Sequence, residues 1–363
     1  MREILGQVDA WTADGAAVAL GTVVGVRRSA PRPPGAKMAV SSRGELAGAV
    51  SGGCVEGAVA TVAEEVLRGG APRLLHFGIA DEEAWEVGLP CGGEIDVWVE
   101  AFEPAGEEDP QALFAALVRG GGRGALVTAL GEGAPRPAAR MLVAPDGART
   151  GSLGDAALDA AAAAHADDLM WAERSELREA AGVGVFVDAA FPPPRLVIFG
   201  AIDFAAQLCT LARTSGWRPF VVDPRARFAT PERFPDAEAV VAAWPEEAFA
   251  LLGGIDRATS IAVLTHDPKL DDAALLLALR SEAPYIGAMG SHLANADRRE
   301  RLLAAGVGEA ELERVNAPIG LDLGGITPEE TALSIMAEIA AVRRGREGGR
   351  LKHASGRIHE VGA

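Results

Sequence analysis

The chain has few cysteines, few aromatic residues and no excess of positive charge. Its three cysteines, at 54, 91 and 209, form no C-x-x-C pair and no cluster with structural zinc spacing, so we expect free thiols in a reduced cytosol. No apolar run is long enough to cross a bilayer, and residues 1–20 lack the pattern of a secretion signal. The sequence therefore predicts a soluble cytoplasmic protein without a membrane partner.

The formal net charge of −17 argues against nucleic acid and anionic membranes as main partners. Binding to a polyanion depends on lysine and arginine displacing counterions from phosphates. Basic residues gather at the end of the chain, at Arg343, Arg344, Arg346, Arg350, Lys352 and Arg357, and the segment 346–363 is a basic tail. We interpret this segment as a solvated basic tail that follows the last helix.

The chain is too long for one ordinary hydrophobic core, since it has 363 residues, and two domains are expected. The segment "FPPPRLVIFG" (191–200) contains three consecutive prolines followed by a compact apolar strand. Prolines fix an extended connector, so the boundary is expected near Pro193. This gives an N-terminal domain over 1–192, a C-terminal domain over 193–345 and the tail.

The N-terminal domain contains a degenerate internal repeat, over about 16–102 and 122–191. "APRPPGAKMAV" (30–40) matches "APRPAARMLV" (134–143), and a constant offset of 103 then places Lys37 on Arg140 and Glu56 on Asp159. Each copy has the pattern of strand, glycine turn, strand, loop and helix, and ends in a similar strand. The pattern predicts an α+β domain.

The two copies differ where the first has "SGGCVE" (51–56), because the second has "GDAALD" (154–159) at the aligned positions. If the Gly-Gly-Cys only served the fold, both copies would need it. The difference favours a functional role for Cys54 and its glycines, against the alternative of a small buried thiol in a turn. Glu56 either orients a ligand amine or simply begins a helix. The first copy also has a second Cys-Gly-Gly, which begins at Cys91.

In the second half, short apolar strands alternate with helices, which indicates a parallel, doubly wound, Rossmann-like sheet. "TPEE" at 327–330 has the residues of a helix start. Cys209 falls in a helical pattern and is expected in the core. The predicted strands are 195–200, 219–224, 239–244, 260–266 and 285–290, with helices over 203–215, over 271–281 and to about Arg344.

Ligands of such sheets bind beyond the carboxyl ends of the strands. Gly200 follows the first strand, but Ile202 stands where a dinucleotide fingerprint needs its second glycine, and Asp203 adds a carboxylate that repels phosphate. Asp203 is explained more simply as a helix N-terminal residue that offsets the macrodipole. We therefore expect a Rossmann-like sheet whose usual phosphate contact is impaired.

Three further strand ends carry polar residues. Asp223, about twenty residues after Gly200, could bind ribose hydroxyls or begin a turn. His266, after Thr265, could donate a proton or bind a ligand, or the segment could be a turn in which Asp267 caps the next helix. Gly290 and Ser291, in "GAMGS", could present backbone N–H groups to an anion.

These strand-end residues leave an oxidoreductase open as an alternative. In an NAD(P)-dependent enzyme Asp223 would bind the ribose and His266 would act as the acid, but Ile202 and Asp203 count against it. A scaffold that binds other proteins without touching a cofactor is a further alternative.

Several segments taken together resemble the XdhC/CoxI family, the accessory proteins of molybdenum hydroxylases of the xanthine dehydrogenase and carbon monoxide dehydrogenase type. The resemblance covers nearly the whole chain, in order. Its segments are "PRPPGAKMAV…GAVSGGCVE", "CGGEIDVWVE", "LVIFGA", "VVDPR…RFP", "LTHDPKLDDAAL", "YIGAMGS" and "APIGLDLGGITPEETALSIMAEI".

The resemblance implies an accessory protein, a chaperone, in preference to an enzyme. This chaperone would bind molybdenum cofactor as molybdopterin or its cytosine dinucleotide form. It would protect the cofactor while a cysteine desulfurase or sulfurtransferase installs the terminal sulfur, and deliver it to an apo-molybdenum hydroxylase. NAD(P) is not expected as a cofactor. The oligomeric state stays open, a homodimer included.

In that family the cysteine of S-G-G-C-x-E is the proposed cofactor-contacting thiol, and Cys54 occupies its position, where it would contact the metal. The resemblance also implies one ligand cleft between the domains, with Cys54 facing His266 and Ser291. The family commonly has G-A-G-H-x-A where this chain has "GAIDFA" (200–205). The predicted cofactor-binding residues are Gly52, Gly53, Cys54, Glu56, Cys91, Gly92, Gly200, Asp223, Thr265, His266, Gly290 and Ser291.

Overall fold

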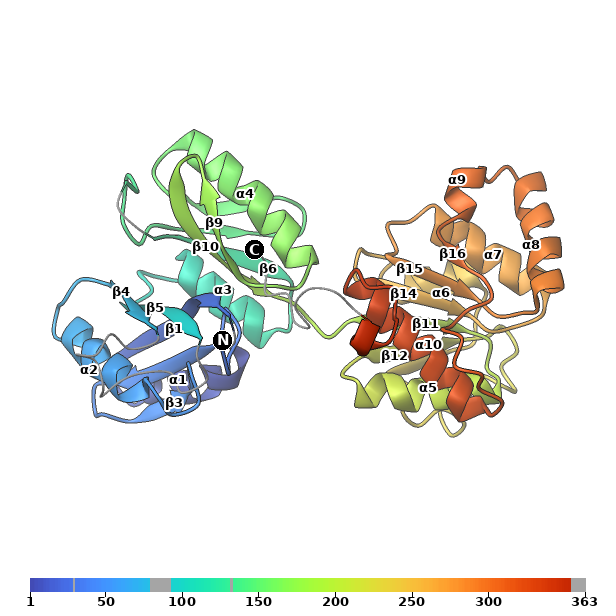
Figure 1. Ribbon diagram of the computed structural model, residues 1–363, viewed down its shortest axis with the longest axis horizontal. Helices are drawn as coiled ribbons and strands as arrows, with labels where there is room; N and C mark the ends of the chain where they lie inside the picture. The colour runs from blue at the N-terminus through green and yellow to red at the C-terminus, as the bar shows by residue number, and fades with distance from the viewer. Residues whose placement is uncertain (29, 79–92, 131–132, 354–363) are drawn as a thin grey trace. The chain divides into compact units, whose positions relative to one another are not determined.

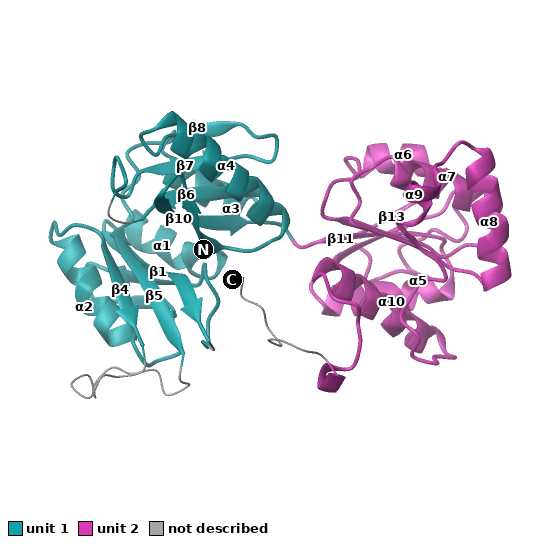
Figure 2. Cartoon of the chain, turned by 45° about the horizontal axis from the view of Figure 1, so that its top comes forward, with its two compact units in different colours: residues 1–192, 359–363 teal, residues 193–358 magenta. Residues whose placement is uncertain are grey.

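The computed structural model describes residues 1–28, 30–78, 93–130 and 133–353. The chain divides into two compact units (Figure 2): the first comprises Met1–Pro192, and the second begins at Pro193. Each unit has hydrophobic clusters of its own.

In the described residues of the first unit, two five-stranded antiparallel sheets repeat the same strand order (Figure 1). Helices α1 (Arg2–Ala13) and α2 (Glu56–Leu67) pack on the first sheet, and α3 (Pro110–Arg119) and α4 (Ala156–Trp171) pack on the second. The first sheet has the order β3 (Leu46–Gly48), β2 (Lys37–Ser41), β1 (Val18–Arg27), β5 (Glu94–Ala101), β4 (Arg73–Phe77). The second has β8 (Arg149–Gly151), β7 (Arg140–Val143), β6 (Gly124–Ala129), β10 (Val183–Ala190), β9 (Glu176–Ala180).

The repeat predicted from the sequence is confirmed down to single glycines. Gly48 and Gly151, which the offset aligns, have φ values of 77° and 87°. A Cβ at either position would collide with a carbonyl oxygen of the neighbouring strand, that of Lys37 or of Arg140. Both copies therefore need glycine at this point, for its positive φ and for the space.

Two reciprocal ion pairs join the copies. The Lys37 Nζ of β2 lies 2.8 Å from the Asp188 carboxylate of β10, and Arg140 of β7 lies 2.7 Å from Glu100 of β5. In each pair the cation comes from one copy and the acid from the closing strand of the other. A hydrophobic cluster also draws residues from both copies, among them Leu20, Ala39, Leu126, Leu142 and Ala190.

Residues 193–353 form a six-stranded parallel sheet with helices on both faces, which confirms the predicted Rossmann-like fold. Its order is β13 (Ala239–Val241), β12 (Arg218–Val222), β11 (Arg195–Phe199), β14 (Thr259–Val263), β15 (Tyr285–Ala288), β16 (Val315–Asn316). The helices are α5 (Asp203–Thr214), α6 (Pro245–Leu251), α7 (Pro268–Leu279), α8 (His292–Ala304), α9 (Glu309–Leu312) and α10 (Pro328–Arg343), followed by a 3₁₀ turn (Leu351–His353).

One hydrophobic cluster joins α5 and α10 to one face of this sheet, and another joins α6 and α7 to the opposite face. Cys209 is fully buried in the first of these, as predicted. The strand order reverses direction between β11 and β14, the position at which ligands bind in open α/β sheets.

Several predicted boundaries are wrong by a few residues, for local reasons. The strand predicted over 260–266 ends at Val263, and the helix predicted from 271 already begins at Pro268, because Asp267 caps it. The strand predicted over 239–244 ends at Val241, since Trp244 is the N-cap of α6. The predicted capping box of Thr327 and Glu330 at the start of α10 is confirmed.

Among the described residues, none of the helices combines the length and the apolar character that a membrane crossing requires.

Candidate functional site

The loop between β3 and α2 is shaped by two consecutive glycines. Gly52 and Gly53 have φ values of 101° and 117°, a region that other residues rarely adopt. A Cβ on Gly53 would meet nothing within 4 Å, so that glycine is needed for its backbone conformation and not for space. The turn lifts Cys54 away from the sheet just before α2 begins.

Glu56, the first residue of α2, holds this loop together through its carboxylate. The carboxylate accepts hydrogen bonds from the Ser51 hydroxyl at 2.7 Å and from the backbone N–H groups of residues 50, 51, 52, 53 and 55 at 2.8–3.2 Å. Partial burial alone would raise the pKa of Glu56, but the hydrogen bonds from Ser51 and Gly52 outweigh it and lower the pKa to about 2. Glu56 therefore begins the helix and organises the loop, and its acceptors are engaged within the chain.

The Cys54 side chain is exposed. Its backbone N–H donates to the Ser51 hydroxyl at 3.0 Å, so the turn holds its backbone in place. The alternative of a small buried thiol is therefore wrong for this cysteine. The predicted site residues Cys91 and Gly92 lie outside the described residues.

The second copy keeps the acid and loses the thiol. Asp159 accepts hydrogen bonds from the Ser152 hydroxyl and from the Leu153 N–H, both at 2.7 Å. The carboxylate–serine contact is thus common to both copies and serves the fold. Cys54 and the turn at Gly52 and Gly53 occur only in the first of the two copies. The second copy therefore shows that the carboxylate–serine contact does not by itself require a cysteine.

At the carboxyl edge of the parallel sheet, Gly200 fits closely against Thr265. Gly200 has a φ of 111°, and a Cβ there would lie 2.5 Å from the Thr265 methyl carbon. The close fit places the ends of β11 and β14 side by side. These are the strands predicted over 195–200 and 260–266.

Asp223, at the end of β12, is fully buried and accepts four hydrogen bonds from the chain. They come from the Ala201 N–H at 2.9 Å, from the Arg225 N–H at 2.9 Å, and from two guanidinium nitrogens of Arg225 at 2.8 and 2.7 Å. Burial would raise the pKa of Asp223, but these hydrogen bonds outweigh it and lower the pKa. The carboxylate ties two strand ends together, and the oxygens that would accept from ribose hydroxyls are already occupied.

The first turn of α5 presents a carboxylate where a dinucleotide fingerprint presents backbone N–H groups. Ile202 is the N-cap and contributes no side-chain hydrogen bond, and Asp203 is the first helical residue. Arg233 donates to the Ala201 carbonyl at 3.0 Å and pairs with Asp203 at 3.3 Å. These contacts, together with the occupied Asp223, count against the oxidoreductase alternative.

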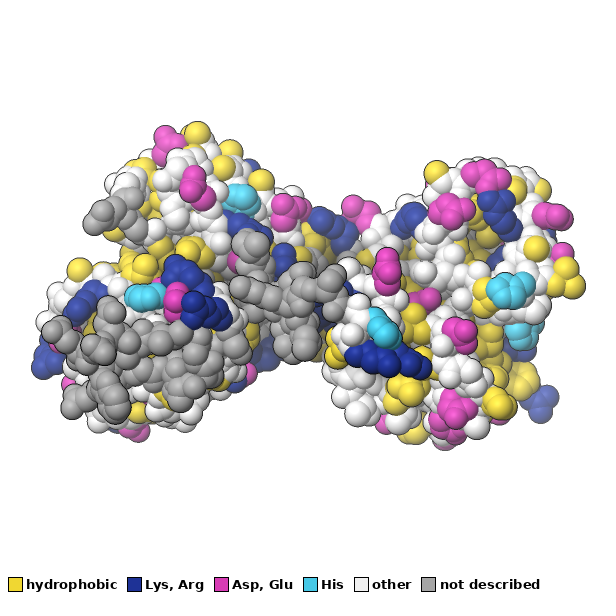
Figure 3. Space-filling view, in the orientation of Figure 1, with side chains coloured by type: hydrophobic (Ala, Val, Ile, Leu, Met, Phe, Trp, Pro, Cys, Tyr) yellow, Lys and Arg dark blue, Asp and Glu magenta, His cyan; other side chains and the backbone are white. Residues whose placement is uncertain are grey.

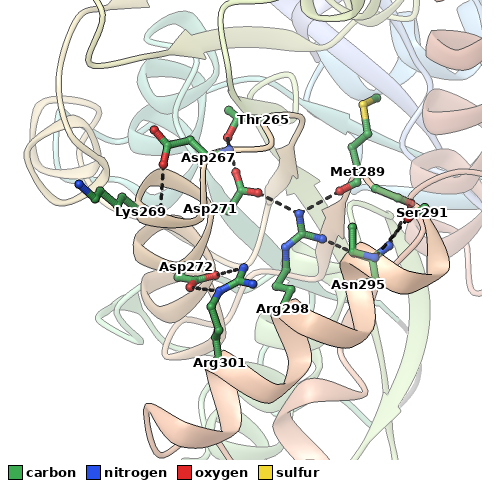
Figure 4. A network of polar contacts seen from close by, with 12 residues as sticks. Thr265, Asp267, Lys269, Asp271, Asp272, Met289, Ser291, Asn295, Arg298 and Arg301 are labelled. Atoms are coloured by element: carbon green, nitrogen blue, oxygen red, sulfur yellow. Dashed lines mark hydrogen bonds and ion pairs between the residues drawn. The ribbon is translucent and has the colours of Figure 1, made fainter.

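A buried polar network joins the ends of β14 and β15 (Figure 4). The Thr265 hydroxyl donates to Asp271, whose other oxygen accepts from Arg298 at 2.8 Å. Arg298 also donates to the Met289 carbonyl at 2.9 Å and to Asn295. Burial raises the pKa of Asp271. The network fixes the two loops that carry His266 and Ser291.

Both of these loops begin helices. Asp267 accepts from the Lys269 N–H at 3.0 Å and caps α7, while Ser291 accepts from the Ala294 N–H at 3.2 Å and caps α8. His266 is exposed between the buried Thr265 and the cap. Two helix N-termini thus lie at the sheet's carboxyl edge. The N-terminus of α8, capped by the neutral Ser291, favours an anion, whereas the Asp267 carboxylate already occupies that of α7.

The structure therefore brings the predicted residues together in two groups, one in each unit. The first group is the loop with Gly52, Gly53, Cys54 and Glu56, and the second is the strand-end edge with Gly200, Asp223, Thr265, His266, Gly290 and Ser291. The pattern of polar residues at strand ends did not point to Asp271, Arg298 or Arg233. Asp271 is the first residue of "DDAALLLALRS" (271–281), where a charged residue at the start of a helix gave no sign of a buried contact.

Comparison with known proteins decides the family. A model of the XdhC and CoxI family matches residues 11–78 and 117–180, and a model of the XdhC Rossmann domain matches residues 196–339. The chain belongs to the XdhC and CoxI family. The resemblance seen in the motifs is therefore confirmed, on both units of this XdhC-type chain.

Relatives match the chain over most of its length. It is 28% identical over 340 residues to the molybdenum cofactor insertion chaperone PaoD of Escherichia coli, covering 92% of this chain and 86% of PaoD. It is 26% identical over 340 residues to a Bacillus subtilis protein named as a probable subunit of xanthine dehydrogenase, covering 93% and 96%. A crystal structure from Bacillus halodurans, described as a xanthine dehydrogenase, has the same fold, with a TM-score of 0.62 at 23% identity over 94% of this chain and 96% of that one.

Proposed function

We propose that this XdhC-type protein binds molybdenum cofactor as cargo and delivers it to a molybdenum hydroxylase. Support comes from the relative named as a molybdenum cofactor insertion chaperone and from the relative named for xanthine dehydrogenase. The observation that carries the proposal is the exposed Cys54 thiol on a loop that Glu56 holds in shape.

The chemistry of the two groups of residues fits this cargo. A thiolate is a soft ligand that suits molybdenum and its dithiolene sulfurs. The described residues contain no group of three or more His, Cys, Asp or Glu that could hold a metal ion. A cofactor that carries its metal on its own organic ligand does not need such a group.

The strand-end edge of the second unit suits the phosphate of the cofactor. The N-terminus of α8 lies there, capped by the neutral Ser291, and His266 is exposed in the loop after β14. Helix N-termini favour anions. We propose that the Cys54 loop contacts the cofactor, as molybdopterin or its cytosine dinucleotide form, and that this edge, taken by itself, is able to bind a phosphate.

The finer steps of the proposal concern sulfur and the client. An exposed thiol is open to a cysteine desulfurase or sulfurtransferase, which would install the terminal sulfur ligand while the cofactor is bound. The client is a hydroxylase of the xanthine dehydrogenase or carbon monoxide dehydrogenase type. In this scheme the chain is an accessory protein and does not turn over a substrate.

The test is to express the protein together with the cofactor pathway and to measure bound pterin by its fluorescence after oxidation and heat release. We expect Cys54→Ala to lose most of the pterin and to fail to activate the apo-hydroxylase. A control in the second copy is Ser152→Ala, which removes the hydroxyl that donates to Asp159 and should load normally. Full pterin content and full activation by Cys54→Ala would disprove the role of the thiol.

Two further results would replace the proposal. Co-purification of the wild-type protein with its client but without pterin would favour a scaffold. Nicotinamide binding at micromolar affinity would favour the oxidoreductase, whose ribose-binding residue is already occupied in this structure.

A further inference from the structure

The turn that follows β12 exposes a phenylalanine ring beside two arginines. Phe228 is 45% exposed, although Phe234 of the same loop is only 2% exposed and packs in the core. The Arg225 guanidinium carbon lies 4.8 Å from the centre of the Phe228 ring, and that of Arg233 lies 5.7 Å from it. Because Phe234 already anchors the loop, the Phe228 ring is available for a contact outside the chain.

The backbone of the turn explains why Phe228 and Arg225 lie together. The Phe228 N–H donates to the Arg225 carbonyl at 2.8 Å, so the chain folds back on itself and brings the two side chains close. Arg233 donates to the carbonyls of Ala201 and Phe228, both at 3.0 Å, and so ties the turn to the loop after β11. The ring is therefore presented by a turn whose backbone is fixed.

Asp223 holds the Arg225 guanidinium in one orientation. Its carboxylate is fully buried and accepts from two nitrogens of that guanidinium, at 2.8 and 2.7 Å. Such a bidentate pair fixes the guanidinium plane, and the Arg225 side chain is still 50% exposed. Hydrogen bonding to Asp223 and the nearby charge of Asp267 raise the pKa of Arg225, so the cation is permanent. The strand-end carboxylate, which binds ribose in dinucleotide enzymes, here positions a flat cation.

The turn also carries a cation besides those that hold it in place. Arg233 is engaged with the Asp203 carboxylate at 3.3 Å, as Arg225 is with its own carboxylate. Arg227, in the same turn, is exposed. On the face drawn in Figure 3, the second unit shows basic side chains between a histidine and hydrophobic side chains. The turn therefore combines an exposed aromatic ring, a guanidinium plane and an exposed cation.

These three elements match the chemistry of a nucleotide. Nucleobases stack on aromatic rings and on arginine guanidinium planes, and a cation beside the stack attracts the phosphate. The place is also suitable, because the turn lies at the carboxyl end of β12, the neighbour of β11 in the sheet. Ligands of open α/β sheets bind at this edge, near the point where the strand order reverses.

We propose that the second unit, taken by itself, binds a nucleotide by stacking its base on the Phe228 ring and the Arg225 guanidinium, with Arg227 attracting the phosphate. Asp223 acts through Arg225 and is a positioning residue. Every base has a face that can stack, so several nucleotides should bind, with little discrimination between bases. The proposal concerns a site of the second unit alone and does not depend on cargo at Cys54.

The experiment titrates the full chain with AMP and with CMP in isothermal titration calorimetry. Ribose phosphate, which lacks a base, serves as the probe for the phosphate alone and should bind much more weakly. Phe228→Leu keeps an apolar side chain and removes the ring, so both nucleotides should bind about tenfold more weakly, the effect of one stacking contact. Phe228→Tyr keeps the ring and should bind them as the wild type does. Because Phe228 is half-exposed, neither variant should lower the melting temperature.

Two further variants test the guanidinium and the specificity of the effect. Arg225→Lys keeps a cation for Asp223 and removes the flat group, so it should weaken the binding of both nucleotides severalfold. The matched control is Trp244→Ala, which removes another half-exposed aromatic side chain of the same unit and should leave binding unchanged.

A second measurement needs no variant. In saturation-transfer NMR of AMP with the wild-type chain, the protons of the base should receive more saturation than those of the ribose, because the base lies against the protein.

Three results would overturn the proposal. The first is a wild-type chain that binds neither AMP nor CMP at millimolar concentration. The second is unchanged binding of both nucleotides by Phe228→Leu at an unchanged melting temperature. The third is equal saturation of base and ribose protons. Weaker binding by Phe228→Leu, with normal binding by Phe228→Tyr and Trp244→Ala, would support the stacking contact.

Discussion

Lys37 and Asp188 form a buried ion pair between the two copies of the repeat, 2.8 Å apart, and Arg140 and Glu100 repeat it in the opposite sense. Lys37 aligns with Arg140 in the sequence, so the same contact is made twice with the partners exchanged. The first unit is thereby a single folded body in which each copy completes the other. Neither copy retains both halves of its ion pair when it is alone.

Removing one partner of this pair should destabilise the first unit strongly. Lys37→Met leaves Asp188 as an uncompensated buried charge, and we expect a loss of about 3–5 kcal/mol in the free energy of unfolding. Urea denaturation measures the loss. The double variant Lys37→Met/Asp188→Leu should regain much of it, and a double variant as unstable as the single one would contradict the explanation.

The Glu56 loop should lose stability in acid. Because the pKa of Glu56 is about 2 in the folded chain and 4.5 is its usual value, its stabilising effect is fully present above about pH 4.5 and is lost as the pH falls toward 2. The free energy of unfolding of wild type and Glu56→Gln should therefore converge over that range. A difference that stays constant from about pH 6 to about pH 2.5 would show that the carboxylate is not held as described.

The cysteines should differ sharply in their reaction with iodoacetamide. Cys54 is exposed, whereas Cys209 is buried and burial raises the pKa of its thiol to about 12. The thiolate is the reacting form, so the native protein should be alkylated at Cys54 and not at Cys209. Peptide mass spectrometry reads each site separately, and unfolding in urea should expose Cys209. Rapid labelling of Cys209 in the native state would contradict its place in the core.

The buried pair at the strand-end edge should be as sensitive as the one in the first unit. Arg298→Met leaves Asp271 without its cation and frees the Met289 carbonyl, so we expect a loss of about 3–5 kcal/mol. Arg301→Met removes a more exposed ion pair, with Asp272, and should cost no more than about 1 kcal/mol. Equal effects of the two variants on urea denaturation would contradict the explanation that burial makes the Arg298–Asp271 pair the more important one.

Local pattern was enough to predict the class of fold and most of its elements. Alternating apolar strands and helices identified the parallel sheet, and the residues at Thr327 and Glu330 marked the start of α10 correctly. The repeat was visible because glycines at positive φ cannot be replaced without strain, so Gly48 and Gly151 keep the alignment in register. The strand and helix patterns, the capping residues and the glycine turns each depend on residues that are close together in the sequence.

What the sequence did not disclose were contacts made across long separations. Asp271 and Arg298 look like ordinary charged residues on two helices, and only the fold places them in one buried network. His76 and Asp96 pair across β4 and β5 in the same way. The direction of the Cys54 side chain depended on Glu56 gathering the loop around its carboxylate, a role that spacing alone does not distinguish from a simple helix start.

The loop around Glu56 has one more consequence, for the energetics of release. Its backbone donors are satisfied by a group of the same chain, so its shape does not wait for a ligand. If the cargo is held at Cys54 as proposed, its binding and release would then require no local folding or unfolding, and the loop would add no ordering cost to the exchange. Such a preformed loop would suit the proposed role of a carrier, whose task is complete only when its cargo has left.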